Sequence, residues 1–232
     1  MSSPETEITQ LLKMEHKGFQ FVIRQGTIDD YVVREVLGGA YKKLNITTDD
    51  VVLDIGLNIG IFTIYALNKG AKKVFAFEPE KDNYKMAVTN VRLNNFDASK
   101  YDLANCAVVG NNDKQRLFSV NTKKNKGGHS LVLKRGRDTV TVDCMNINEI
   151  IEKTKATVIK MDIEGGEYEC IKAIKSFDGI REMELEFHHA HLNDIKTHAK
   201  YDEIVSLLKK HFTQVDYKEP KKNWITYIYC KK

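Results

Sequence analysis

The 232-residue sequence lacks the features of several protein classes. Its four cysteines form no C-x-x-C pair, so neither a zinc-binding pattern nor a disulfide framework is predicted. No segment approaches the roughly 18 consecutive apolar residues that a membrane span needs. The first ten residues, MSSPETEITQ, are polar and acidic, without the apolar core of a signal peptide. We therefore expect a cytoplasmic chain without a membrane span, or one domain of a longer protein.

Net charge gives little indication of a partner, because a formal charge of +4 is too mild to predict a polyanionic ligand. The positive charge gathers around Gly127-Gly128, in Lys123, Lys124, Lys126, Lys134, Arg135 and Arg137. A solvated loop is the simpler interpretation of this stretch. A surface that receives an anionic acceptor is the alternative.

The order of strands and helices predicts an α/β fold. Short apolar runs rich in β-branched residues predict strands at 51–55, 74–78, 103–109, 157–163 and 183–188. Helical spacing of apolar residues predicts a helix after the first strand and another from about Asp82 to Leu93, with Asp82 as N-cap. Two further helices are predicted, one beginning near Glu167 and one at 201–212. Strands that alternate with crossover helices favour a mainly parallel sheet with helices on both faces.

Two parts of the chain depart from this alternation. Residues 110–150 contain short alternating runs and predict a β-rich excursion. The last two strands, around 213–217 and 224–230, are joined by about six residues, too few for a crossover helix, so they should form an antiparallel hairpin. We expect one domain over 1–232, with a seven-stranded sheet and an N-terminal extension over 1–45. No motif in that extension assigns Asp29, Asp30 or Tyr31 to a site.

A glycine turn directly follows the first strand of the α/β pattern, in Asp54-Ile55-Gly56-Leu57-Asn58-Ile59-Gly60. Gly56 and Gly60 predict a tight turn and a close approach of a ligand that a Cβ would block. The dinucleotide fingerprint G-x-G-x-x-G is absent, because Asn58 replaces the second glycine and Ile61 the third. A pyrophosphate cofactor is therefore not favoured.

An acidic residue, Glu78, ends the next strand in Phe77-Glu78-Pro79. Its position, some twenty residues after the glycine turn, is suited to accept hydrogen bonds from both hydroxyls of a ribose. Together with the turn it predicts a nucleoside ligand.

Several motifs in the same order resemble the FkbM family of methyltransferases: D-I-G-L-N-I-G-I-F-T at 54–63, F-E-P-E at 77–80, Asn90 and Asn94, and K-M-D-I-E-G-G-E at 160–167. The resemblance covers about residues 50–190. It implies a Rossmann-like class I methyltransferase fold, S-adenosylmethionine as methyl donor, and transfer to a hydroxyl oxygen, frequently on a sugar. It also implies that Asp54, Gly56, Asn58, Gly60 and Glu78 hold the cofactor, and that Asp162 and Glu164 lie near the methyl group.

Acidic residues and a histidine follow two further strands. Asp162 and Glu164 end the strand at 157–163, and ligands of such sheets bind at the carboxyl ends of strands. Glu167 could simply favour the first turn of the next helix. In Glu186-Phe187-His188-His189-Ala190-His191, alternation predicts Glu186 and His188 on one face and His189 on the other. His188 should lie next to Asp162.

These residues lead to a mechanistic hypothesis with one open choice. His188 is a reasonable general base for the acceptor hydroxyl, with Asp162 orienting the cofactor or the base. Alternatively, the histidine with Asp162 and Glu164 could hold a divalent metal that acidifies the hydroxyl. We expect the 110–140 excursion, including His129 and Ser130, to shape the acceptor site.

We thus predict an S-adenosylmethionine-dependent O-methyltransferase acting on a sugar or glycan, as an independent chain or within a longer glycan-modifying protein. An RNA ribose 2′-O-methyltransferase is an alternative suggested by the basic stretch, but only Phe118 lies nearby to stack on a base, and we do not expect a nucleic-acid partner. A nucleoside-binding module without catalysis is the alternative from another class.

Overall fold

A central sheet organises the computed structural model, which describes residues 10–120, 128–131, 138–189, 195–218 and 225–232. Within these residues the sheet has seven strands in the order β11-β12-β10-β9-β3-β4-β5. The strands are β3 (Val51–Ile55), β4 (Lys73–Phe77), β5 (Tyr101–Ala104), β9 (Val158–Met161), β10 (Glu182–His188), β11 (Gln214–Tyr217) and β12 (Ile225–Lys231). β12 runs antiparallel to both of its neighbours, and the other pairings are parallel. The predicted fold class is confirmed.

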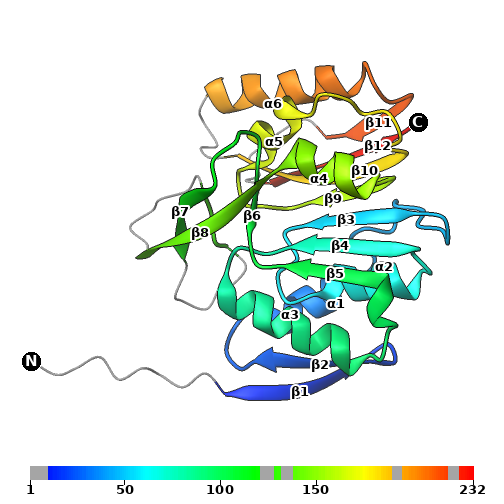
Figure 1. Cartoon of the computed structure of the whole chain (residues 1–232), viewed down its shortest axis with the longest axis vertical. Helices are drawn as coiled ribbons and strands as arrows, with labels where there is room; N and C mark the ends of the chain where they lie inside the picture. The colour runs from blue at the N-terminus through cyan, green and yellow to red at the C-terminus, as the bar shows by residue number, and fades with distance from the viewer. Residues whose placement is uncertain (1–9, 121–127, 132–137, 190–194, 219–224) are drawn as a thin grey trace, which may run out of the picture.

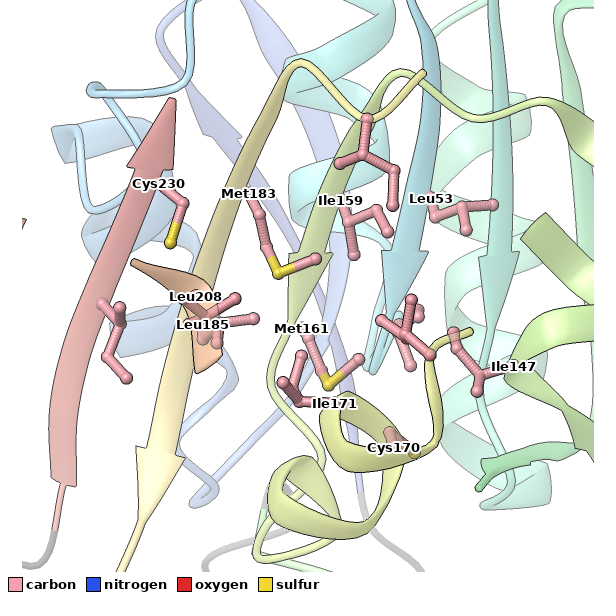
Figure 2. Close-up of a cluster of buried hydrophobic side chains, with 14 of the residues drawn as sticks. Leu53, Ile147, Ile159, Met161, Cys170, Ile171, Met183, Leu185, Leu208 and Cys230 are labelled. Atoms are coloured by element: carbon pink, nitrogen blue, oxygen red, sulfur yellow. The ribbon is translucent and has the colours of Figure 1, made fainter. Parts of the chain in front are cut away.

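Helices cover both faces of this sheet because the strand residues alternate between two apolar cores. The helices are α1 (Asp29–Gly38), α2 (Ile61–Asn68), α3 (Lys81–Leu93), α4 (Ile147–Thr154), α5 (Glu167–Ala173) and α6 (Ile195–Leu208). Leu53, Ile159 and Leu185 face α4, α5 and α6, as Figure 2 shows for one part of this core. Val52 and Val158 face the opposite way, toward α1, α2 and α3. None of the described helices is long and apolar enough to cross a membrane.

A smaller sheet lies beyond the carboxyl ends of the parallel strands, formed by β6 (Ala107–Val109), β7 (Gln115–Val120) and β8 (Asp138–Asn146). In Figure 1 it lies on the side toward which the arrows of β3, β4 and β5 point. The strand predicted at 103–109 is therefore wrong as one element. It is divided at Asn105, whose amide donates hydrogen bonds to the carbonyls of Glu78 and Pro79, so the chain leaves the central sheet there.

Two further predictions about local structure are corrected. The N-cap of α3 is Glu80 rather than Asp82, because a Glu80 carboxylate oxygen accepts the N–H of Asn83 at 2.7 Å. The 110–150 region contains β7 and β8, as expected, but it also contains the start of α4.

The N-terminal residues form a hairpin, β1 (Leu11–His16) and β2 (Phe19–Arg24), that lies beside α3 (Figure 1). Two α3 side chains bind the backbone of β2. The Asn90 oxygen accepts the N–H of Val22 at 2.7 Å, and the Asn94 amide bonds both the N–H and the carbonyl of Gln20. At the end of β2 a buried Arg24–Asp29 ion pair, 2.9 Å long, connects the hairpin to α1. The hairpin thus positions α1.

The glycine turn after β3 is tight, but its close approach is to the protein itself. Gly56 has φ +93°, and a Cβ there would lie 1.8 Å from the carbonyl oxygen of Asp162. A Cβ on Gly60 would lie 3.1 Å from the Cα of Ala87 in α3. These glycines let β3 lie against the end of β9 and let α2 lie against α3, and the predicted close approach of a ligand stays a prediction.

We predict that Gly56→Ala destabilises the fold by more than about 4 kcal/mol, because backbone atoms would have to separate. Gly179→Ala is a matched control: Gly179 also has positive φ, +81°, but no atom lies within 4 Å of its added Cβ. That change should cost only about 1–2 kcal/mol. Urea denaturation of both variants checks this, and equal losses would contradict the steric explanation.

Candidate active site at the carboxyl ends of the strands

A cavity of about 360 Å³ opens at the carboxyl ends of the parallel strands. Its walls come from α1, the turn after β3, the ends of β4, β9 and β10, the start of β12, and residues His129 and Leu131. Ligands of open α/β sheets bind at this edge. The cavity is therefore the candidate functional site.

Glu78 lies on the wall formed by the end of β4 and is 5% exposed. One carboxylate oxygen accepts the N–H of Asn58 at 2.8 Å, and the other accepts the N–H of Glu80 at 2.9 Å. Burial raises the pKa of Glu78 to about 7, although these two hydrogen bonds oppose the shift. Asn58 also lines the cavity and has φ +52°. The predicted turn residue and the predicted acidic residue are thus joined at one wall.

Lys160, on β9, is a buried cation in the floor of the cavity. Its ammonium donates to the carbonyl of Gly56 at 2.6 Å and lies 3.3 Å from the carboxylate of Asp54 and 3.9 Å from that of Asp162. Burial lowers the pKa of Lys160, but the two carboxylates more than offset this and the net direction is upward. The side chain therefore stays charged and is not suited to act as a base.

Asp54 is completely buried and is not among the residues that line the cavity. Its carboxylate accepts a hydrogen bond from Thr63 of α2 at 2.8 Å and pairs with Lys160. Burial raises the pKa of Asp54, partly opposed by Lys160 and Thr63. The predicted contact of Asp54 with a cofactor stays a prediction, whereas its contacts here hold the glycine turn and α2 in place.

Three carboxylates, those of Asp162, Glu164 and Glu186, stand on the opposite wall around one imidazole. The Nε2 atom of His188 lies 3.9 Å from Asp162, 3.6 Å from Glu164 and 3.7 Å from Glu186. The predicted neighbourhood of His188 and Asp162 is confirmed. Burial, together with the charge of Asp162, raises the pKa of Glu186 to about 8.

The side chain of Glu167 holds this wall together, in addition to its place in the first turn of α5. Its buried carboxylate accepts the N–H groups of Ile163 and Gly165 and lies 3.0 Å from Nδ1 of His188. Burial raises the pKa of Glu167, but His188 and the two amides reverse this, so the net direction is downward. Burial lowers the pKa of His188, but Glu167 and the other carboxylates raise it well above its usual value.

Only some of the remaining predicted residues line the cavity. His129 lines the cavity. Ser130 does not; its hydroxyl donates to the carbonyl of Glu164 at 2.6 Å and so supports the wall. His188 is also absent from the lining, because its ring lies behind the carboxylates. His189 faces away from Glu186, against Thr226 and Tyr201, as alternation predicts. His191 and the basic stretch at 123–137, apart from 128–131, lie outside the described residues.

Sequence reasoning missed the side chains at the cavity mouth. Tyr31 and Glu35 come from α1, and Tyr227 lies directly opposite Glu186 in the β10–β12 pairing. Tyr31 is 63% exposed and Tyr227 is 40% exposed. No periodic signal marked Tyr31 or Glu35 as site residues. A lysine within an apolar strand, as in VIKMDI, could have identified Lys160, because a buried lysine requires partners.

A family model described as the methyltransferase FkbM domain matches residues 54–218. The chain belongs to the FkbM methyltransferase family. The matched range contains Asp54, the glycine turn, Glu78 and the wall around His188. α1, with Tyr31 and Glu35, lies before the matched range.

Known proteins show distant likeness to this FkbM methyltransferase. Methyltransferase sdnD of Sordaria araneosa is 25% identical over 167 residues, which span 58% of this chain and 64% of that protein. The match therefore covers less than two thirds of the relative's length. TYW2 of M. jannaschii, solved in complex with AdoMet, is 12% identical, with a TM-score of 0.51 over 96% of this chain and 86% of that chain.

A Streptococcus mutans protein to which SAM-dependent methyltransferase activity is ascribed gives a TM-score of 0.52 at 10% identity, over all of this chain and 57% of that one. At such low identity these two structures establish the fold of this family member and nothing finer.

We predict that Lys160→Met lowers the free energy of unfolding by about 3–5 kcal/mol, because it leaves Asp54 buried without its cation. The control is Lys172→Met, whose ammonium pairs with Glu203 where both side chains are well exposed. That change should cost less than about 1 kcal/mol. Urea denaturation measures both. Adding Asp54→Asn to Lys160→Met should recover part of the loss, and no recovery would argue against the buried pair.

Proposed function

We propose that this FkbM methyltransferase transfers the methyl group of S-adenosylmethionine to a hydroxyl of a sugar or glycan. The observation that carries the proposal is the division of one cavity into two chemically different ends. A buried acidic residue beside a glycine turn forms one end, and a wall of carboxylates below exposed tyrosines forms the other.

The first end fits a nucleoside. Each oxygen of an ionised carboxylate offers two acceptor positions, and each oxygen of Glu78 uses one for a backbone N–H. The remaining positions can accept both ribose hydroxyls. Apolar side chains of Leu57, Ala107 and Val108 line the cavity and would contact the adenine ring. Asn58 and Gly56 complete this end through the turn that Lys160 holds.

The second end fits a polyhydroxylated acceptor. Tyrosine offers an apolar ring for the C–H face of a sugar and a hydroxyl for hydrogen bonding. Carboxylates such as Glu35 and Glu186 accept hydrogen bonds from sugar hydroxyls. Tyr31 donates to Glu35 at 3.3 Å, so ring and carboxylate are presented together at the mouth.

S-Adenosylmethionine supplies an already activated methyl group, so the protein mainly aligns the acceptor and removes a proton. In the transfer the methyl–sulfur bond breaks, the methyl–oxygen bond forms, and the hydroxyl proton passes to a carboxylate. We assign this last step to Glu164. It has φ +55°, an unfavourable backbone conformation held by Ser130 and, through the next residue, by Glu167. His188 lies behind the cavity wall and therefore positions the carboxylates rather than contacting the acceptor.

The two alternatives, methylation of RNA ribose and nucleoside binding without catalysis, are less well supported. RNA binding depends on lysine and arginine contacts to phosphates, whereas Asp162, Glu164, Glu186 and Glu35 make the acceptor end acidic. A binding module without catalysis gives no reason to hold Glu164 in an unfavourable backbone conformation beside a nucleoside site.

The test is transfer of radiolabelled methyl from S-adenosylmethionine into a fractionated cell extract. The expected product is an O-methyl monosaccharide released by acid hydrolysis, with its label stable to mild alkali. Tyr31→Ala should raise the acceptor KM about tenfold with little change in kcat, while Tyr31→Phe stays near wild type. Label in nucleosides, alkali-labile label, or no transfer by protein that binds S-adenosylhomocysteine would overturn the proposal.

Cofactor affinity should depend on pH through Glu78. Because the pKa is raised to about 7 and the ionised form accepts the ribose hydroxyls, binding should strengthen as pH rises. The ionised fraction grows roughly tenfold between about pH 6 and 8, and the affinity for S-adenosylhomocysteine should follow. Calorimetry should show that Glu78→Gln loses this dependence and binds about tenfold more weakly or worse. Glu152→Gln on the exposed side of α4 is the control, and a pH-independent wild type would contradict the assignment.

A further inference from the structure

Side chains at the ends of two neighbouring strands converge on one point of the cavity wall. One ligand atom each from Asp162, Glu186 and His188 lies within 4.8 Å of the other two. β9 and β10 are parallel and paired, with Leu185 opposite Met161, so Asp162 and Glu186 follow at the same level. His188 comes two residues after Glu186 and therefore shares its face.

The imidazole of His188 is held in the orientation of a metal ligand. Its Nδ1 lies 3.0 Å from the carboxylate of Glu167, which is completely buried and fixed by two backbone amides. Histidines that bind metals usually donate their second ring N–H to a carboxylate in this way. With Nδ1–H donated to Glu167, Nε2 faces the cluster, where a bound cation would take the place of the Nε2 proton.

The distances from Nε2 of His188 to the surrounding carboxylate oxygens are too long for direct hydrogen bonds and leave space for an ion. The His188 side chain is 8% exposed, and the three carboxylate oxygens that face Nε2 lie 3.6–3.9 Å away. A nitrogen–oxygen hydrogen bond is about 2.7–3.2 Å long. Two ligands that each lie about 2.1 Å from a common ion are separated by more than 3 Å, so these separations suit atoms arranged around a cation.

We infer that Asp162, Glu186 and His188 form a binding site for one divalent cation of the Mn²⁺ or Mg²⁺ class. Two carboxylates balance the charge of the ion, and oxygen-rich ligand sets with one imidazole suit these hard cations. Asp162 and Glu186 line the cavity, so the open coordination positions face the acceptor end. An acceptor oxygen bound there would lose its proton more readily, to the carboxylate of Glu164. The site shares the cavity of the proposed function but does not depend on which acceptor is methylated.

The experiment measures Mn²⁺ binding to chelator-treated protein by calorimetry and by electron paramagnetic resonance, without cofactor or acceptor. Wild type should bind one Mn²⁺. The isosteric changes Asp162→Asn and Glu186→Gln, and His188→Gln, should each weaken binding at least about tenfold, and Glu167→Gln by about 10–100-fold through the misplaced imidazole. Excess Mg²⁺ should displace the Mn²⁺ signal.

Glu35→Gln is the matched control, since it removes a carboxylate of the same cavity outside the cluster and should change Mn²⁺ affinity no more than a few-fold. Circular dichroism verifies that each variant is folded, and Asp162→Asn and Glu186→Gln provide two independent tests if one is not. Absence of Mn²⁺ binding by wild type, or equal binding by both of these variants, would overturn the site. Because no methyl acceptor is present, failure of sugar methylation would leave this result unaffected.

Discussion

The site depends on the hydrogen bond and ion pairs of one buried group, the ammonium of Lys160. It joins the carbonyl of the glycine turn after β3 to two carboxylates, Asp54 beneath the turn and Asp162 at the end of β9. A charge in this position is costly unless its partners are fixed, and they are fixed because Gly56 lets the two strand ends touch. One cation thus joins the wall that we propose for the nucleoside to the acidic wall of the cavity.

Much of the fold could be predicted because it depends on local periodicity. The parallel strands, their crossover helices and the antiparallel end follow from apolar spacing and loop length, and Glu78 and Asp162 follow from their places at strand ends. The alternation of side chains along a strand also placed His188 and His189 on opposite faces correctly.

The rest depends on contacts between distant segments, which no local pattern records. The neighbours that a Cβ on Gly56 or Gly60 would meet come from β9 and α3, so the packing role of these glycines could not be predicted from the local pattern. Ser130 supports Glu164 from a separate segment. Tyr31 reaches the cavity because the hairpin, which Asn90 binds, positions α1 through the Arg24–Asp29 ion pair. The strand expected at 103–109 is divided at Asn105, whose side-chain amide donates hydrogen bonds to the carbonyls of Glu78 and Pro79.

The attachment of β2 to α3 through Asn90 and Asn94 has an evolutionary consequence. Tyr31 and Glu35 at the cavity mouth come from α1, which is joined to the hairpin, whereas the proposed nucleoside end lies at the ends of β3 and β4. Under the proposed function, substitutions in the hairpin would reshape the acceptor end of the cavity while leaving the methyl-donor end unchanged. Such separation would allow one catalytic frame to diversify its substrates by altering a segment that lies before residues 54–218, the range that the family model matches.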